Sequence, residues 1–155
     1  MSKVIKIGIS KNQNNHGCLG SCLSQIDNVN EIDVIEGKGI VGDRYFAENN
    51  EKRKQITLIE VENIDFYNKI SNTNIPDIKF RRNIVTKGIK LNDLVGKKFY
   101  IGNVKVKAHD LCRPCKNLEE SLKQKNIIKE FILKGGLRCE ILSSGKIFVD
   151  DMIKQ

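Results

Sequence analysis

The sequence contains no tryptophan, and only 6% of its 155 residues are aromatic. Surfaces that bind nucleic acid usually combine clustered basic residues with interleaved aromatic side chains. Here the net charge is +8, but the lysines are dispersed along the chain. This pattern predicts a solvated basic surface that would attract small anionic partners, and nucleic acid is not expected among them.

Long apolar runs are also missing. No stretch approaches the roughly 20 apolar residues that a membrane span needs, and MSKVIKIGIS lacks the features of a signal peptide. We therefore expect a cytoplasmic protein without a membrane partner, whose cysteines stay reduced. The cysteines number five, and an odd count argues against a complete disulfide framework. The length suits one domain over residues 1–155, with no repeat or linker.

The pattern of apolar residues predicts a mainly β fold with a few short helices inserted. Ile5, Ile7 and Ile9 alternate with polar or small residues, which is typical of a half-buried strand. Seven or eight such short strands predict a β-barrel or closed sheet. Further strands are expected at 31–35, 55–59 and 80–85, and a helix over 61–70.

Two hairpins are expected in the second half of the chain. Gly102-Asn103 is a two-residue turn of the kind favoured between strands. It would pair Ile101 with Val104 on one apolar face. The tail LRCEIL-SSGK-IFVDD predicts a second hairpin, in which Cys139 faces inward and is buried.

The stretch HDLCRPC, residues 109–115, is the strongest chemical signal and allows three interpretations. A zinc ion could be held by four thiolates. A strand followed by C-x-P-C and a helix resembles the thioredoxin redox site, but its facing proline has no clear counterpart in Pro76. The third interpretation is one accessible thiolate that binds a softer, larger group. The zinc ligands would be Cys18, Cys22, Cys112 and Cys115.

Several stretches, taken in order, carry a resemblance to a known family. They are GIVGDRY, KQITLIE, FRRNIVTKGIKLNDLVGKKFYIG, LCRPCKNLE and GGLRCEILSSGKIFVDD. Together they resemble the MOSC domain, which is named after the C-terminal domain of molybdenum cofactor sulfurases. The resemblance covers about residues 37–151 and implies a β-barrel with a few helices. Its best understood members bind the molybdenum–pterin cofactor and reduce N-hydroxylated substrates, and others are proposed to carry sulfur.

The resemblance also implies roles for particular residues. Cys115 would be the metal ligand or sulfur carrier, with Cys112 as the second choice. Arg44, Arg81 and Asn83 would lie around the phosphate of the cofactor. Arginine suits phosphate because its planar guanidinium binds two oxygens at once. Apart from the resemblance, His109 lies three residues before Cys112 and could hydrogen-bond a ligand there or act as a general acid.

Other readings of these residues remain open. Each arginine could be an ordinary surface residue, and only one of Arg81 and Arg82 can face a given side of a strand. The domain could reduce a small molecule with the cofactor bound. It could instead be a non-enzymatic sulfur carrier or partner-binding module without molybdenum. A cysteine desulfurase or a redox partner would be its protein partner. Cofactor binding by the domain alone or across a homodimer is equally compatible with the sequence.

Overall fold

The structure is a computed structural model of the chain, and it describes residues 2–10, 26–112 and 134–155, apart from the side chain of Ile78. Within these ranges the chain is mostly strands, with one α-helix, and no described helix is long and apolar enough to cross a membrane. The helices are η1 (Lys52–Lys54), α2 (Val61–Ser71), η2 (Asp77–Phe80) and η3 (Leu91–Leu94). The strands are β1 (Lys3–Ile9), β2 (Asp27–Val29), β3 (Glu31–Ile35), β4 (Gly39–Ile40), β5 (Ile56–Glu60), β6 (Ile84–Lys87), β7 (Lys98–Ile101), β8 (Val104–Leu111), β9 (Leu137–Ile141), β10 (Gly145–Phe148) and β11 (Ile153–Lys154).

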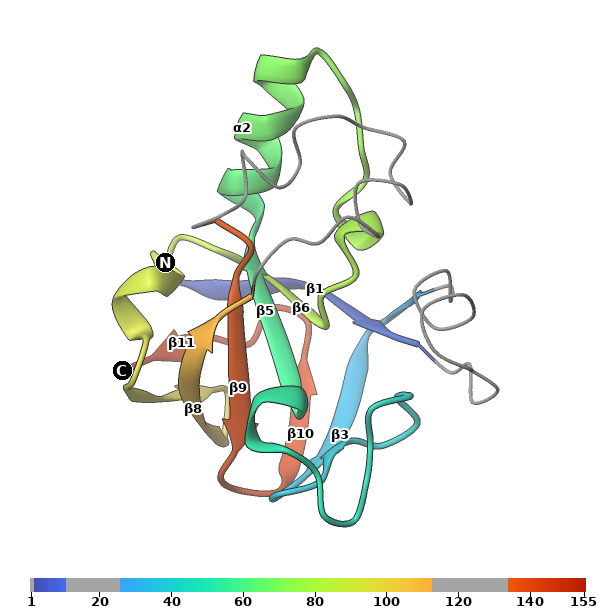
Figure 1. Cartoon of the computed structure of the whole chain (residues 1–155), viewed down its shortest axis with the longest axis vertical. Coiled ribbons are helices and arrows are strands. Elements are labelled where there is room, and N and C mark those ends of the chain that lie inside the picture. The colour runs from blue at the N-terminus through green and yellow to red at the C-terminus, as the bar shows by residue number, and fades with distance from the viewer. Residues whose placement is uncertain (1, 11–25, 113–133) are drawn as a thin grey trace.

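Most strands join one curled sheet in the order β11-β7-β8-β9-β5-β6-β1-β2, which forms a half-barrel (Figure 1). An antiparallel bridge between Lys3 and Met152 brings the first half of β1 to the chain beside β11. The backbone N–H of Val4 donates to Asp151 O at 2.9 Å in the same region. The two ends of the sheet therefore approach each other around a shared core.

A smaller sheet has the order β10-β3-β4. The parallel pair β5–β6 is connected through α2, as a parallel pair requires a crossover. The helix extends from the end of β5 at one end of the molecule (Figure 1).

The core follows from the alternation of apolar residues along the strands. In β8 the side chains of Val104, Val106 and Ala108 are fully buried, and the residues between them are only partly buried. The larger of two apolar clusters lies inside the curled sheet and contains, among others, Ile7, Leu58, Ile84, Phe99, Ile101 and Cys139. The smaller cluster lies where α2 packs against the sheet and includes Ile64 and Tyr67.

The β-rich fold and the first hairpin are confirmed. Strands β7 and β8 pair with Ile101 opposite Val104 and Phe99 opposite Val106, as the Gly102-Asn103 turn predicts. The prediction of a helix over 61–70 is also confirmed by α2. These elements depend on local patterns, which explains why the sequence is informative about them.

Two strand predictions are wrong. β9 and β10 do not form a hairpin, because β9 is already paired on both sides, with β8 and β5. β10 pairs with β3 of the smaller sheet instead. The predicted strand over residues 80–85 is also displaced, since residues up to Phe80 form η2 and β6 begins at Ile84. Arg81, between them, has a φ of +66°, which no strand residue adopts.

Candidate thiol and arginine site

Strand β8 delivers the chain to Cys112, the first cysteine of the HDLCRPC motif. The backbone N–H of Cys112 donates to Gly136 O at 2.7 Å. The Cys112 side chain is only 5% exposed. Cys112 therefore does not provide the accessible thiolate of the third interpretation.

Residues 134–136 form the turn that leads into β9. Their carbonyls accept hydrogen bonds from three separate segments of the chain. Asn63 Nδ2 donates to Lys134 O at 3.5 Å, and Arg82 Nε donates to Gly135 O at 3.0 Å. Gly136 O accepts from Cys112 as described above. Gly136 has a φ of +95°, and a Cβ there would lie 1.7 Å from Leu58 O. Glycine is therefore the only residue that fits between β5 and the cysteine.

Two guanidinium groups act on the Cys112 thiol. The positive charges of Arg82 and Arg138 lower the pKa of the thiol, and hydrogen bonding by the Arg82 side chain acts in the same direction. Burial nevertheless dominates and raises this pKa above its ordinary value, and the negative charge of Asp110 acts in the same direction. Cys112 is thus held as a neutral thiol next to a cationic cluster.

Arg138 is fixed in this cluster by Asp110 on the neighbouring strand. Arg138 Nε donates to Asp110 Oδ1 at 3.0 Å, and a second bond joins Nη2 to Oδ2. The hydrogen bond to Asp110 and its charge raise the pKa of Arg138. Arg53 Nη1 lies 3.9 Å from the same carboxylate. Such a bidentate pair fixes the orientation of the guanidinium as well as its charge.

The turn after β4 carries the predicted Arg44. Asp43 is 5% exposed, and its carboxylate accepts from Ser10 N at 2.9 Å and from Tyr45 N at 3.2 Å. Arg44 N donates to Ser10 O at 2.7 Å, and the guanidinium lies 4.6 Å from the centroid of the Tyr45 ring. Burial raises the pKa of Asp43, although these hydrogen bonds and Arg44 oppose the shift. The Asp43 carboxylate thus shapes the turn that presents Arg44.

The predicted Asn83 joins this turn to the main sheet. Its Oδ1 accepts from Thr57 N, and its Nδ2 donates to Gly8 O, both at 3.1 Å. Hydrogen bonding by its side chain also lowers the pKa of the Asp43 carboxyl. The structure therefore brings Asn83 next to the turn of Arg44, and Asn83 holds β1, β5 and this turn in register.

Other predicted residues lie apart or outside the described ranges. The His109 ring is hydrogen-bonded to Glu140 of β9, with 2.9 Å between Nε2 and Oε1. Arg81 is half-buried next to Arg82, the arginine that reaches the thiol. Cys139 is fully buried, as predicted, and burial raises its pKa well above the ordinary value. Cys18, Cys22, Arg113 and Cys115 lie outside the described residues.

No local pattern in the sequence indicates a role for Arg82, Arg138 or Asp110. In the sequence, Arg82 is one of two adjacent arginines, and the resemblance in FRRN points to Arg81 instead. Arg138 and Asp110 sit on different strands and meet only because β8 and β9 pair in register, with Asp110 opposite Arg138.

Residues 33–154 match the family described as MOSC domain. This match spans most of the chain. The protein belongs to the MOSC domain family. MOSC domains are associated in general with the molybdenum cofactor.

Solved structures share the fold of this MOSC domain. YuaD from Bacillus subtilis is 17% identical with a TM-score of 0.76, covering 99% of this chain and 94% of its own. YiiM from Geobacillus stearothermophilus is 15% identical with a TM-score of 0.77, covering 99% and 74%. YiiM from Escherichia coli is 15% identical with a TM-score of 0.67, covering 99% and 69%. No curated protein sequence matches the chain.

Proposed function

We propose that this MOSC domain acts in the cytoplasm, where it binds the molybdenum cofactor or accepts sulfur destined for it, with Cys115 as the working thiolate. Membership of the MOSC family is the first support. The second is the cationic cluster at the end of β8, where the positive charges of Arg82 and Arg138 lower the pKa of the Cys112 thiol. Cys112 lies three residues before Cys115 in the sequence. This cluster is the observation that carries the proposal.

The chemistry of the described residues fits such a group. The cofactor carries a phosphate and soft sulfur donors, and it would be attracted by guanidinium groups. The hydroxyl of Ser10 is buried and has no hydrogen-bond partner among the described residues, next to the turn that presents Arg44. Buried hydroxyl groups normally have a partner. An added polar group at this turn would satisfy it.

In this proposal different residues of the chain bind the phosphate of the cofactor and offset the negative charge near its sulfur donors. Arg44 and Arg81 would bind the phosphate, while Asn83 holds the turn of Arg44 in place. Arg82 and Arg138 would offset negative charge near the thiols. When bound, the cofactor supplies a molybdenum centre for which a further thiolate is a compatible ligand. Such a centre would allow the reduction of an N-hydroxylated small molecule, with electrons from a separate redox partner.

The burial of Cys112, which is only 5% exposed, favours a mechanism with one working thiolate over a dithiol, because thiol–disulfide exchange requires access to the attacking thiolate. As a sulfur acceptor, the Cys115 thiolate would attack the outer sulfur of a persulfide on a cysteine desulfurase. The S–S bond of the donor breaks, the donor leaves as a thiolate, and Cys115 becomes a persulfide.

The test is elemental analysis of the full chain produced in a host that makes the cofactor. Molybdenum near one per chain supports the cofactor site, and persulfide on Cys115 without metal supports the sulfur carrier. In both cases Cys115→Ala should lose the signal and Cys139→Ala should keep it, because Cys139 lies inside the core. Zinc near one per chain, or no metal and no persulfide, would contradict the proposal.

A further inference from the structure

Arg82 is half-buried, and the partners of its guanidinium are two backbone carbonyls. Its Nε donates to Gly135 O at 3.0 Å, and its Nη1 donates to Phe80 O at 3.2 Å. Both acceptors are uncharged, and in the described part of the chain no carboxylate forms an ion pair with Arg82. A charged group that is partly withdrawn from water normally has a counter-charge. The described residues therefore leave the positive charge of Arg82 without one.

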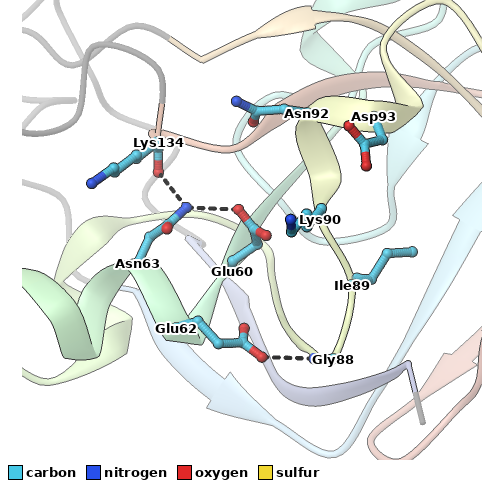
Figure 2. Close-up of a pocket in the computed structure, with 9 residues that line it drawn as sticks. All are labelled: Glu60, Glu62, Asn63, Gly88, Ile89, Lys90, Asn92, Asp93 and Lys134. Carbon is cyan, nitrogen blue, oxygen red and sulfur yellow. Dashed lines mark hydrogen bonds between the residues drawn. The ribbon is translucent and has the colours of Figure 1, made fainter.

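The turn that holds Arg82 is fixed on both sides of Gly135. Asn63 Nδ2 of α2 donates to Lys134 O at 3.5 Å (Figure 2), and Cys112 N donates to Gly136 O at 2.7 Å. Gly135 lies between these two anchored residues and is buried. The Arg82 guanidinium is thus oriented in advance, one residue along the turn from the backbone partner of Cys112.

Two further guanidinium groups near this thiol share one carboxylate. Arg138 binds Asp110 through two hydrogen bonds, and Arg53 Nη1 lies 3.9 Å from the same carboxylate. Glu51 also acts on Arg138, but it forms its own ion pair with Lys54 at 3.1 Å. The side chains of Arg138 and Arg53 are 36% and 59% exposed, so a ligand can reach them from solvent.

The thiol of Cys112 does not supply the missing negative charge. It is 5% exposed, and burial raises its pKa, so the group is neutral near pH 7. Within the described ranges, the charges of Arg53, Arg82 and Arg138 are therefore offset mainly by Asp110. Guanidinium groups bind oxyanions through parallel N–H donors, and an excess of them at one place attracts anionic ligands.

We propose that Arg82, Arg138 and Arg53 form an anion subsite beside the thiols, which selects substrates that carry a carboxylate, sulfonate or phosphate group. The inference rests on the proposed function for the reaction itself, because it names the class of substrate that the same site takes. The oxyanion of the substrate supplies the counter-charge that Arg82 lacks. Arg53, the most exposed of the three, meets the incoming anion first.

The test compares alkylation of Cys112 by iodoacetate and by iodoacetamide in the full chain, near neutral pH and at low salt. The two reagents have nearly the same size and attack the same thiolate. Their rate ratio therefore cancels the effects of burial and thiol pKa and leaves the effect of the reagent's charge. We expect this ratio to be about fivefold higher in the native chain than at Cys112 of the urea-denatured chain. Peptide mass mapping separates Cys112 from the other thiols.

Charge variants should shift this ratio in opposite directions. Arg53→Gln and Arg138→Gln should each lower it about twofold, and Asp110→Asn should raise it, because it removes the carboxylate that offsets the arginines. Lys154→Gln is the matched control, since it removes the same charge from an exposed residue of β11, and it should leave the ratio unchanged. Arg82→Gln also loses two backbone contacts, so the Asp110→Asn result serves as a test that does not require that variant to fold.

A native ratio equal to that of the denatured chain would overturn the inference. An equal fall in Arg53→Gln and Lys154→Gln would also overturn it, since the attraction would then belong to the whole surface. Neither readout depends on molybdenum or persulfide content. Bound molybdenum without a preference for iodoacetate would reject the anion subsite alone, whereas a preference in a chain that takes up neither molybdenum nor sulfur would support the subsite and reject the proposed function.

Discussion

Thr57 of β5 and Asn83, the residue just before β6, are joined by three hydrogen bonds. Thr57 N and Thr57 Oγ1 both donate to Asn83 Oδ1, and Asn83 N donates to Thr57 Oγ1, each at 3.1 Å. The other end of the Asn83 amide donates to Gly8 O of β1. One amide therefore fixes three strands and the buried Asp43 next to the proposed phosphate site.

Removal of this amide should destabilise the fold. Asn83→Ala leaves the N–H of Thr57 and the carbonyl of Gly8 without a partner, and we expect a loss of about 2 kcal/mol in the free energy of unfolding. Urea denaturation measures the loss. Asn49→Ala, on an exposed loop, serves as the control and should change stability little. Equal stability of the two variants would show that Asn83 does not hold the strands together.

Gly37 and Gly136 both have a positive φ, but substitution by alanine should affect stability very differently at the two positions. Gly37 has a φ of +73° with no atom within 4 Å of an added Cβ, and Gly136 has a φ of +95° with Leu58 O 1.7 Å away. Gly37→Ala should cost only the strain of a left-handed residue, about 1 kcal/mol. Gly136→Ala must also separate β5 from the turn before β9, and we expect it to cost more than about 3 kcal/mol. Similar thermal unfolding of the two variants would contradict this geometry.

The cysteines should react with a thiol reagent in a fixed order near neutral pH. Cys139 is fully buried and should remain unlabelled until denaturant is added. Cys112 should react slowly, because it is 5% exposed and its pKa is raised. Cys115, if it is the working thiolate, should react first. Timed alkylation with peptide mass mapping follows all three, and labelling of Cys139 as fast as Cys115 would make Cys115 a packing residue.

Alkaline pH should lower the free energy of unfolding, because the buried thiol of Cys139 resists ionisation in the folded chain. Burial raises the pKa of this thiol well above its ordinary value near 9.0. The unfolded chain therefore loses the proton first, so the contribution of the thiol is complete below about pH 9 and declines as the pH rises above that. Within this window the loss for one group approaches about 1.4 kcal/mol per pH unit.

The measurement for this prediction is urea denaturation of the wild type and Cys139→Ala from about pH 8 to about pH 10.5. The variant loses a buried sulfur, which lowers its stability at every pH. Its decline with pH should nevertheless be shallower than that of the wild type. Other groups that titrate in this range are common to both proteins. Parallel curves would mean that Cys139 ionises as readily in the folded as in the unfolded chain.

The sequence alone determined the elements that depend on local patterns. The alternation around Gly102-Asn103 predicts the hairpin of β7 and β8 in its observed register, and the helical spacing in VENIDFYNKI predicts α2. The burial of Cys139 follows from the same alternation, because neighbours two apart lie on one face of a strand. The order of several short stretches was also sufficient to recognise the MOSC family.

Only the tertiary structure decided which edges and side chains meet. The SSGK segment looks like a hairpin turn, but β9 has no free edge, so β10 pairs with β3. Cys112 follows the end of a strand, yet it is only 5% exposed, and its backbone N–H donates to Gly136 O. Arg82 and Arg138 become neighbours of one thiol because three separate segments converge there. Strand edges and burial depend on residues distant in sequence, and no local pattern of side chains encodes them.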